Sequence, residues 1–274
     1  MPGAMAFDGG AFFAWLQHSA VGWAAAALLG ACLGSFINVV IYRLPRDLSL
    51  VRPRSRCPVC GRMIRAVENI PLLSYLALGG RCRGCAARIP LRYPAVEALG
   101  AALTLAAVVT SHSAAEAAVH TALVLALLAV VFIDLDFRII PDAITLPGTV
   151  AGLLWSLVGP LPARDSFLGV LAGGGGLLLI AWGYQRVTGR EGLGLGDVKL
   201  MAMVGAFLGW GGALGTVLAG SLAGSLVGLG LILAGRGNRL TALPFGTFLA
   251  PAAWLVVFQG EALWRCYLAL FPMP

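Results

Sequence analysis

Carboxylate side chains are scarce in this chain and mark the places where long apolar runs end or begin. The 274 residues include only 12 Asp and Glu. Asp134 and Asp136 close one apolar run, and Asp197 opens another, directly after Gly194 and Gly196. An aspartate near the middle of a membrane helix costs about 2.5–3.5 kcal/mol, so such residues are usually functional. Two aspartates at one depth can share a proton, so that one activates water while the other polarises a carbonyl group. The pattern indicates a pair of aspartates that could hydrolyse a peptide bond.

Asp134 is the better partner for Asp197 in the first cluster. Asp134 and Asp136 are two residues apart, so on a helix they point about 200° away from each other and only one can face Asp197. Asp134 lies about 3 Å deeper by helical rise, which makes its burial costlier and favours a functional role. Asp136 is left without an assigned role. Asp142 follows Pro141 and precedes an apolar run, which is typical of a helix N-cap.

Four of the six cysteines have the spacing of metal ligands. They form two pairs, Cys57-Pro-Val-Cys60 and Cys82-Arg-Gly-Cys85. Each pair can present two thiolates from one tight turn, and two such turns complete a tetrahedral Cys₄ site for Zn²⁺. Four thiolates leave no open coordination position, so the spacing predicts a structural metal and not a catalytic one. The alternative is disulfide pairing, which requires an oxidising compartment.

The elements that position these side chains are predicted to be membrane helices. The chain is 59% hydrophobic and 11% charged, and its mean hydropathy is +0.89, whereas soluble domains carry about 25% charged residues. We therefore expect an all-α polytopic membrane protein, surrounded by membrane lipid, with about eight transmembrane helices of the length that a bilayer requires. The expected spans are 20–42, 94–111, 117–135, 143–159, 166–187, 197–210, 212–234 and 246–270.

Arginines concentrated between the first two spans predict the orientation. By the positive-inside rule this loop is cytoplasmic, which also weakens the disulfide alternative. The net charge of +7 does not indicate nucleic acid as a partner, because orientation in the membrane accounts for the basic residues. The eleven arginines of the loop are Arg43, Arg46, Arg52, Arg54, Arg56, Arg62, Arg65, Arg81, Arg83, Arg88 and Arg92.

Three regions follow from these patterns. Residues 1–42 are expected to hold an N-terminal segment and the first transmembrane helix. Residues 43–93 are expected to form a small cytoplasmic zinc-binding loop domain, and residues 94–274 a seven-helix membrane domain that carries the aspartates. Gly220, Gly224 and Gly228 recur at every fourth residue, which predicts close helix packing in lipid. The run Gly173–Gly176 is expected to loosen its helix or to make a close contact.

Several motifs together resemble those of the bacterial type IV prepilin peptidases, a family of GxGD aspartic peptidases. The motifs run in order from residue 34 to about residue 250, so the resemblance covers nearly the whole chain. The family pattern Pro-Phe-Gly-Pro reads Pro244-Phe-Gly-Thr247 here, a departure that concerns a local turn. The matching segments are Gly34 to Pro45, the two cysteine pairs, Glu68 to Tyr75, Arg92 to Glu97, the Asp134 segment and Gly192 to Leu200.

The resemblance implies a specific activity and specific site residues. It implies that Asp134 and Asp197 are the catalytic pair of a prepilin peptidase in the bacterial inner membrane, with its active site facing the cytoplasm. Its substrates would be type IV prepilins or type II secretion pseudopilins, whose basic leader is removed. Many members then methylate the new N-terminal amine with S-adenosylmethionine, an activity that goes with the cysteine-containing loop. Gly79 and Gly80 in that loop are suspected neighbours of the methyl donor.

Other interpretations remain open from the residues alone. Glu97 could serve interfacial packing or methyl transfer equally well. The chain could be a peptidase without methyltransferase activity. A proton- or cation-coupled transporter would explain Asp134 and Asp197 but not the cysteine pairs. A zinc-binding scaffold would explain the cysteine pairs but not the costly carboxylates.

Overall fold

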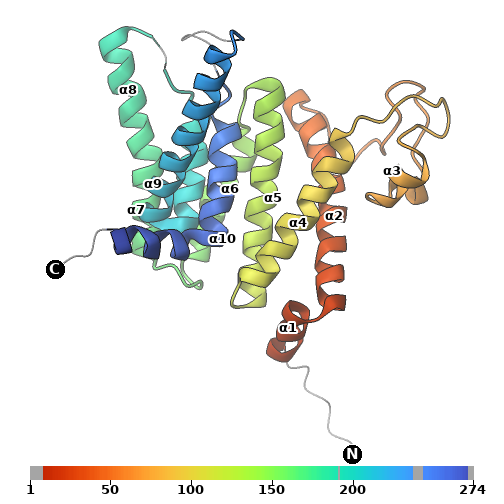
Figure 1. Ribbon diagram of the computed structural model, residues 1–274, viewed down its shortest axis with the longest axis horizontal. Helices are drawn as coiled ribbons and strands as arrows, with labels where there is room; N and C mark the ends of the chain where they lie inside the picture. Colours follow the sequence, from red (N-terminus) through yellow and green to blue (C-terminus); the bar gives the residue numbers. More distant parts are fainter. Residues whose placement is uncertain (1–8, 191, 237–242, 271–274) are drawn as a thin grey trace, which may run out of the picture. The chain divides into compact units, whose positions relative to one another are not determined.

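The computed structural model describes residues 9–190, 192–236 and 243–270, which form helices and connecting loops without any strand (Figure 1). The ends of the first and last predicted regions therefore lie outside the described residues. The chain divides into two compact units, Met1–Ala129 and Val130–Pro274, and the boundary falls within α5. The helices are α1 (Gly9–His18), α2 (Ala20–Arg43), α3 (Leu73–Ala77), α4 (Arg92–Thr110), α5 (Ala114–Phe137), α6 (Asp142–Trp155), α7 (Ala163–Val170), α8 (Gly176–Thr188), α9 (Leu195–Leu233) and α10 (Gly246–Leu270).

In the first unit, α2 packs closely against α4. A Cβ atom on Gly100 would lie 2.6 Å from the carbonyl oxygen of Gly30, so the two helices touch through their backbones. Gly34 makes a similar approach, because a Cβ atom there would lie 2.9 Å from the Cα atom of Glu97. Glycine permits this approach since any side chain would hold the helices apart. The loop that connects α2 to α4 contains α3 and all four paired cysteines.

In the second unit, α7 and α8 are joined by a π-helical turn, Leu171–Gly175, that packs against α9. A Cβ atom on Gly174 would lie 2.8 Å from Cβ of Ala202, whereas nothing lies within 4 Å of such an atom on Gly175 or Gly176. The glycine run therefore combines the two expected roles, since one part makes a close helix contact and the other part faces open space. The extra residue in a π-helical turn accommodates the change from glycines that contact α9 to glycines that do not.

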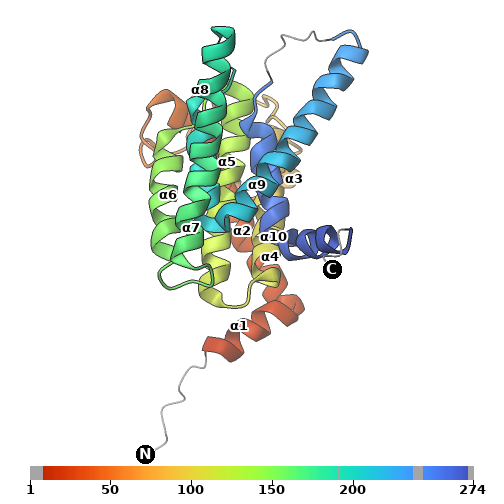
Figure 2. The ribbon, with the colours of Figure 1, turned by 90° about the vertical axis from the view of Figure 1, so that its left-hand side faces the viewer.

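The helix α9 is two helical segments that meet at Gly209. Gly209 has φ 70° and ψ −178°, a conformation that favours glycine. A Cβ atom on Gly173 would lie 3.0 Å from the carbonyl carbon of Met201 and 3.3 Å from Cβ of Ala213. In a straight helix these two residues would be about 18 Å apart. The chain therefore doubles back at Gly209, as Figure 2 shows, and the two segments correspond to the predicted spans 197–210 and 212–234.

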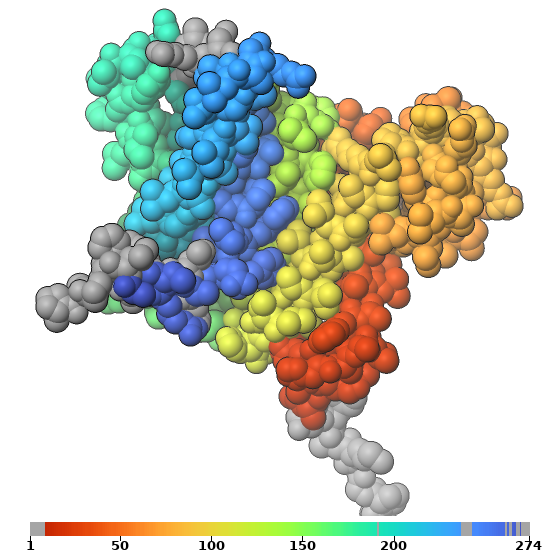
Figure 3. Space-filling model, in the orientation of Figure 1, coloured from red at the N-terminus to blue at the C-terminus, as the bar shows by residue number. Residues whose placement is uncertain are grey.

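The second segment of α9 runs beside α10. A Cβ atom on Gly220 would lie 3.0 Å from Leu249, and one on Gly224 would lie 3.5 Å from Phe248. Gly228 faces Leu243 in the same way. Figure 3 shows the two helices side by side on the face that is viewed. The prediction that this glycine stripe serves helix packing is confirmed.

Five helices among the described residues are long and apolar enough to cross a membrane. The helix α6 has only 14 residues, and Gly246–Gly260 of α10 form a shorter apolar helix, after which α10 turns sharply (Figures 1 and 2). The all-α membrane class is confirmed, whereas the expected count of eight spans is not. The five spans are Ala20–Arg46, Arg92–Thr110, Ala114–Phe137, Ala163–Thr188 and Leu195–Leu233.

Candidate functional site

Asp134 lies in the last turn of α5 and is 5% exposed, whereas Asp136 is exposed. The main-chain N–H of Thr247, at the start of α10, donates to Oδ2 of Asp134 over 2.8 Å. The hydroxyl group of Thr247 donates to the same oxygen over 3.2 Å. The greater burial of Asp134 agrees with its deeper position in the helix. Its catalytic role stays a prediction.

Asp197 lies in the first turn of α9 and is 9% exposed. The turn is tight, because the N–H of Asp197 donates to the carbonyl of Gly194 over 3.1 Å. A Cβ atom on Gly194 would lie 3.3 Å from Oδ2 of Asp197, so a larger residue would crowd the carboxyl group. The charge of Asp134 acts on Asp197, so the structure brings the two predicted carboxyl groups within electrostatic reach of each other.

Ile140 lies where the end of α5 meets the starts of α9 and α10 in the second unit. It follows α5 in the loop that leads to α6. A Cβ atom on Gly196 would lie 3.0 Å from Cβ of Ile140, and one on Gly246 would lie 2.7 Å from its Cδ1 atom. The starts of α9 and α10 therefore both press on this one side chain. Glycine at positions 196 and 246 allows the backbones to approach without obstruction, as expected for position 196.

Asp142 forms an ion pair with Lys199. The Nζ atom of Lys199 donates to Oδ1 of Asp142 over 2.8 Å and to Oδ2 over 2.7 Å. The N-cap expected at Asp142 is wrong by one residue, because Pro141 is the N-cap and its side chain makes no capping bond. Asp142 is instead the first helical residue, where a negative charge favours the positive end of the helix dipole.

The four paired cysteines come together as predicted. Their Sγ atoms all lie within 4.8 Å of one another, and those of Cys57 and Cys85 are 3.9 Å apart. Tetrahedral Zn–S bonds of about 2.3 Å would place sulfur atoms about 3.8 Å apart. All six cysteines are free thiols in the structure, and 3.9 Å far exceeds the length of a disulfide bond. The donor set therefore fits a metal ion such as zinc.

The two cysteine turns repeat one hydrogen-bonding pattern. The N–H of Cys57 donates to the carbonyl of Arg62 over 2.9 Å, and the N–H of Cys82 donates to that of Ala87 over 2.8 Å. The fourth residue after each first cysteine returns a bond to it, from Gly61 to Cys57 and from Ala86 to Cys82. Each turn is closed by a single antiparallel bridge. Such turns direct two sulfur atoms to one point, as the spacing predicted.

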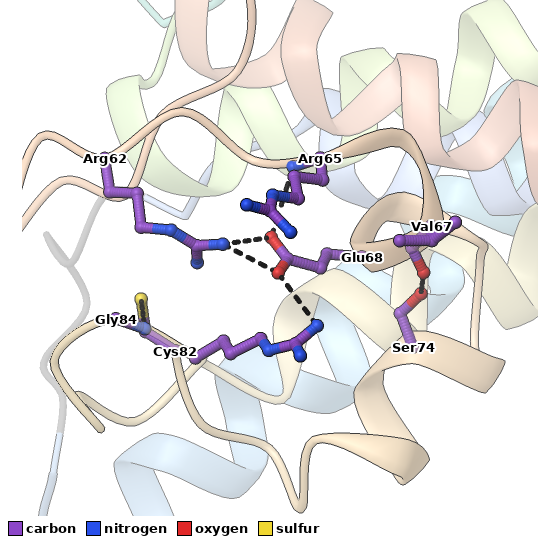
Figure 4. Close-up of polar contacts among 8 residues, drawn as sticks. Arg62, Arg65, Val67, Glu68, Ser74, Cys82 and Gly84 are labelled. Carbon is purple, nitrogen blue, oxygen red and sulfur yellow. Dashed lines mark hydrogen bonds and ion pairs between the residues drawn. The ribbon is translucent and has the colours of Figure 1, made fainter.

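Main-chain donors stabilise the thiolates of Cys57 and Cys82, whereas burial and the neighbouring sulfur atoms raise the pKa of Cys85 to about 11. The N–H groups of Gly84 and Cys85 lower the pKa of Cys82 to about 6, and the first of these lies 3.4 Å from the sulfur (Figure 4). The N–H groups of Cys60 and Val59 lower the pKa of Cys57 in the same way. A thiol with a lowered pKa binds a metal ion with less competition from protons.

Glu68 ties the two cysteine turns together (Figure 4). Its side chain is 6% exposed and accepts hydrogen bonds from Arg62 over 2.8 and 3.1 Å. Arg83, inside the second turn, lies 3.6 Å from the same carboxylate, and the N–H of Arg65 donates to it over 3.1 Å. The hydrogen bonds from Arg62 and Arg65 lower the pKa of Glu68 against the opposing effect of burial. The glutamate therefore stays ionised and holds both turns.

A cavity of about 580 Å³ lies between this loop and the ends of α2 and α4 in the first unit. Pockets of roughly 300–1,000 Å³ are typical of small-molecule sites. Its lining includes Tyr42, Tyr75 and Tyr93 and several arginines. Gly79 and Gly80 do not line it, but a Cβ atom on Gly80 would lie 2.8 Å from the hydroxyl oxygen of Tyr75. A side chain at position 80 would therefore press on Tyr75, which lines the cavity.

Glu97 holds a strained turn beside this cavity. Leu72 has φ 62° and ψ −50°, and the N–H of Leu73 donates to the carbonyl of Pro71 over 2.6 Å, which together define a rare γ-turn. The N–H of Leu72 donates to Oε2 of Glu97 over 2.8 Å. Glu97 lines the cavity as well. Glu97 therefore supports one wall of the cavity, whereas the sequence left interfacial packing and methyl transfer equally open.

Comparison with known proteins identifies the relatives of this chain. A profile described as the Bacterial Peptidase A24 N-terminal domain matches residues 28–111, and one described as the Type IV leader peptidase family matches residues 121–229. A prepilin leader peptidase/N-methyltransferase of Aeromonas salmonicida is 40% identical over 281 residues, which covers 93% of this chain and 95% of that protein. The chain belongs to the type IV leader peptidase family.

Further members of the type IV leader peptidase family match at similar levels. A prepilin leader peptidase/N-methyltransferase of Pseudomonas putida is 40% identical over 268 residues, with 89% of this chain and 93% of that protein covered. One of Myxococcus xanthus is 45% identical over 216 residues, with 78% and 64% covered. No solved structure matches the chain significantly. The resemblance found from the motifs is confirmed, and the transporter and scaffold interpretations lose their support.

Proposed function

We propose that this chain is a membrane aspartic endopeptidase that removes the basic leader from type IV prepilins or type II secretion pseudopilins. It then methylates the new N-terminal amine of the product. The observation that carries the peptidase half is the pair of buried carboxyl groups, Asp134 and Asp197, in the second unit. The methyltransferase half is supported by the relatives, whose names combine both activities.

Hydrolysis needs both carboxyl groups in different protonation states. The ionised carboxylate takes a proton from a water molecule, and the water oxygen attacks the carbonyl carbon of the scissile peptide bond. The protonated partner donates a hydrogen bond to the carbonyl oxygen. A proton then passes to the departing amide nitrogen, the C–N bond breaks, and the pair is ready for another cycle. Two carboxyl groups at close range favour this division because they do not ionise together easily.

The cysteine cluster would hold a structural zinc ion. Cys57, Cys60, Cys82 and Cys85 would be its ligands, and Glu68 would brace the loop around them. Purified protein should contain about one zinc per chain, and replacement of Cys82 by serine should remove it. Metal analysis of both proteins decides this point.

The cavity in the first unit fits the methyl donor. S-adenosylmethionine supplies a methyl group when bound, and its carboxylate is of the kind that arginine recognises. Tyr42, Tyr75 and Tyr93 offer aromatic faces for an adenine ring. Glu97, by holding the γ-turn, would keep this wall of the cavity in place.

The orientation and the division into regions follow from the loop and the helices after it. The arginine-rich loop favours the cytoplasmic side of a bacterial inner membrane. If α4 then leads outward and α5 leads back, Asp134 at the end of α5 would lie at the cytoplasmic face, where a basic leader would lie. The regions 1–42, 43–93 and 94–274 serve as membrane anchor, zinc-binding loop and peptidase domain.

Cleavage of a prepilin peptide in detergent tests the proposed function. Mass spectrometry should show loss of the leader and then the gain of one methyl group. Asp134→Asn and Asp197→Asn should each nearly abolish cleavage, and their double variant should be no worse, because the pair acts as a unit. Asp142→Asn removes the ion pair with Lys199 but neither carboxyl group of the pair, and it should lose far less activity. Full cleavage by either variant of the pair would falsify the aspartic mechanism.

A further inference from the structure

Thr247 stands where the family pattern has a proline, and both of its donors reach Asp134. The distances to Oδ2 are 2.8 Å from the N–H and 3.2 Å from the hydroxyl group. Thr247 is the second residue of α10, so its N–H has no acceptor within the helix. Asp134 therefore satisfies a free donor in the first turn of α10, the N–H of Thr247, which lies 113 residues later in the chain.

The start of α10 is pressed against this carboxyl group. A Cβ atom on Gly246 would lie 3.0 Å from Oδ2 of Asp134 and 3.3 Å from its Cγ atom. The carboxyl group is 5% exposed, and a buried polar group without a partner is costly. The two hydrogen bonds from Thr247 both reach Oδ2, and the N–H of Gly246 also acts on this carboxyl group. Neither bond from Thr247 engages the other oxygen, Oδ1.

We infer that Thr247 is a positioning residue for peptide hydrolysis, which holds Asp134 through Oδ2 so that Oδ1 accepts the proton of the attacking water. Asp134 is then the base of the pair, and Asp197 is the acid that polarises the scissile carbonyl. This inference rests on the proposed function. It also gives a chemical role to a residue that departs from the family pattern, because proline has neither an N–H nor a hydroxyl group to donate.

Three substitutions at this position separate the two donors. Thr247→Ser keeps both, Thr247→Val loses only the hydroxyl group at nearly the same shape, and Thr247→Pro loses both. Proline is compatible with the first turn of a helix. We expect kcat for leader cleavage to stay near the wild-type value in Thr247→Ser, to fall roughly 3- to 10-fold in Thr247→Val and roughly 30- to 100-fold in Thr247→Pro, with KM changed less than about 2-fold.

A matched control removes another buried hydroxyl group of the same unit. Thr216 is fully buried in α9, and its hydroxyl group donates to the carbonyl of Gly212 over 2.8 Å. Thr216→Val should therefore leave kcat unchanged. The alternative is that residue 247 only shapes the turn. In that case Thr247→Pro, which restores the family pattern, should cleave at least as fast as the wild type.

The outcomes separate this inference from the proposed function. If the wild-type protein cleaves no prepilin, both the proposed function and the inference about Thr247 are wrong. A wild-type protein that cleaves, together with Thr247→Val and Thr247→Ser variants of equal kcat, overturns the inference alone. Equal or faster cleavage by Thr247→Pro also overturns it. Should Thr247→Pro fail to fold, as judged by size-exclusion chromatography in detergent, the comparison of valine with serine still decides.

Discussion

At the scale of single residues, the two cysteine turns adopt the same backbone with different residues at one position. The position four residues after the first cysteine has positive φ in both, 70° at Gly61 and 58° at Ala86. A glycine adopts this conformation without strain, whereas for an alanine the strain energy is about 1–2 kcal/mol. Ala86 is exposed, so its methyl group gains little from packing. The second turn therefore carries strain that the first turn avoids.

This difference predicts that Ala86→Gly stabilises the metal-binding loop. The gain should be about 0.5–1 kcal/mol, because the relief of strain is partly offset by the greater chain entropy of glycine. Competition with a chelator should show zinc retained at higher chelator concentration. Gly61→Ala is the reverse change in the matching turn and should release zinc more readily. If both variants moved zinc retention in the same direction, the proposed equivalence of the turns would be wrong.

At the scale of helices, the ion pair between Asp142 and Lys199 joins the starts of α6 and α9. Asp142 follows the loop after the Asp134 helix, and Lys199 lies two residues after Asp197. The pair thus links the segments that carry the two carboxyl groups. Its side chains are 54% and 36% exposed, so solvent screening limits its contribution to about 0.2–1 kcal/mol.

A charge exchange tests whether this link aligns the pair. Lys199→Asp and Asp142→Lys alone should each lower kcat for cleavage about 3- to 10-fold, since each places like charges side by side. The double exchange should recover part of the loss, because the attraction is restored with opposite polarity. A double-mutant cycle on the cleavage rate measures the coupling energy. Losses that simply add in the double variant would show that the two residues act independently.

Several of these helix contacts were beyond sequence reasoning, for identifiable physical reasons. The burial of Asp134 and the meeting of four cysteines follow from hydropathy and from local spacing. The hydrogen bonds from Thr247 to Asp134 join segments of one unit that are distant in the sequence. The contacts of Ile140 with the starts of α9 and α10 do the same. No periodicity in the sequence encodes such contacts. The only sequence signal for Thr247 was its departure from the proline of the family pattern. The bend at Gly209 lies at the end of the predicted span 197–210, just before the predicted span 212–234.

At the scale of the whole molecule, the carboxyl pair belongs to one compact unit and the cavity with the cysteine cluster belongs to the other. Methyl transfer needs a deprotonated amine and an aligned donor but no carboxylate pair. The two proposed activities therefore use different residues, and each unit should tolerate damage to the other.

Separate assays on two variants test this independence. Asp197→Asn should still methylate a pilin that is supplied already cleaved. Gly80→Phe should impair methylation more than cleavage, because the new side chain would displace Tyr75 from the cavity wall, and its zinc content should report that the loop is still folded. Equal loss of both activities in Gly80→Phe would show that the loop only stabilises the fold. A well-folded wild type that never methylates a cleaved pilin would be a peptidase only.

The bend at Gly209 also has a consequence for the lipid around the protein. The segment of α9 that carries Asp197 has only about 14 residues before the chain turns back at this bend, and α6 is equally short. Such helices span about 21 Å, whereas the hydrocarbon core of a bilayer is about 30 Å thick. The acyl chains must therefore thin locally or admit water beside the carboxyl pair, and hydrolysis requires that water. In proteoliposomes of one headgroup, we expect leader cleavage to be faster in short-chain than in long-chain lipid, and a rate independent of acyl length would show that water arrives by another path.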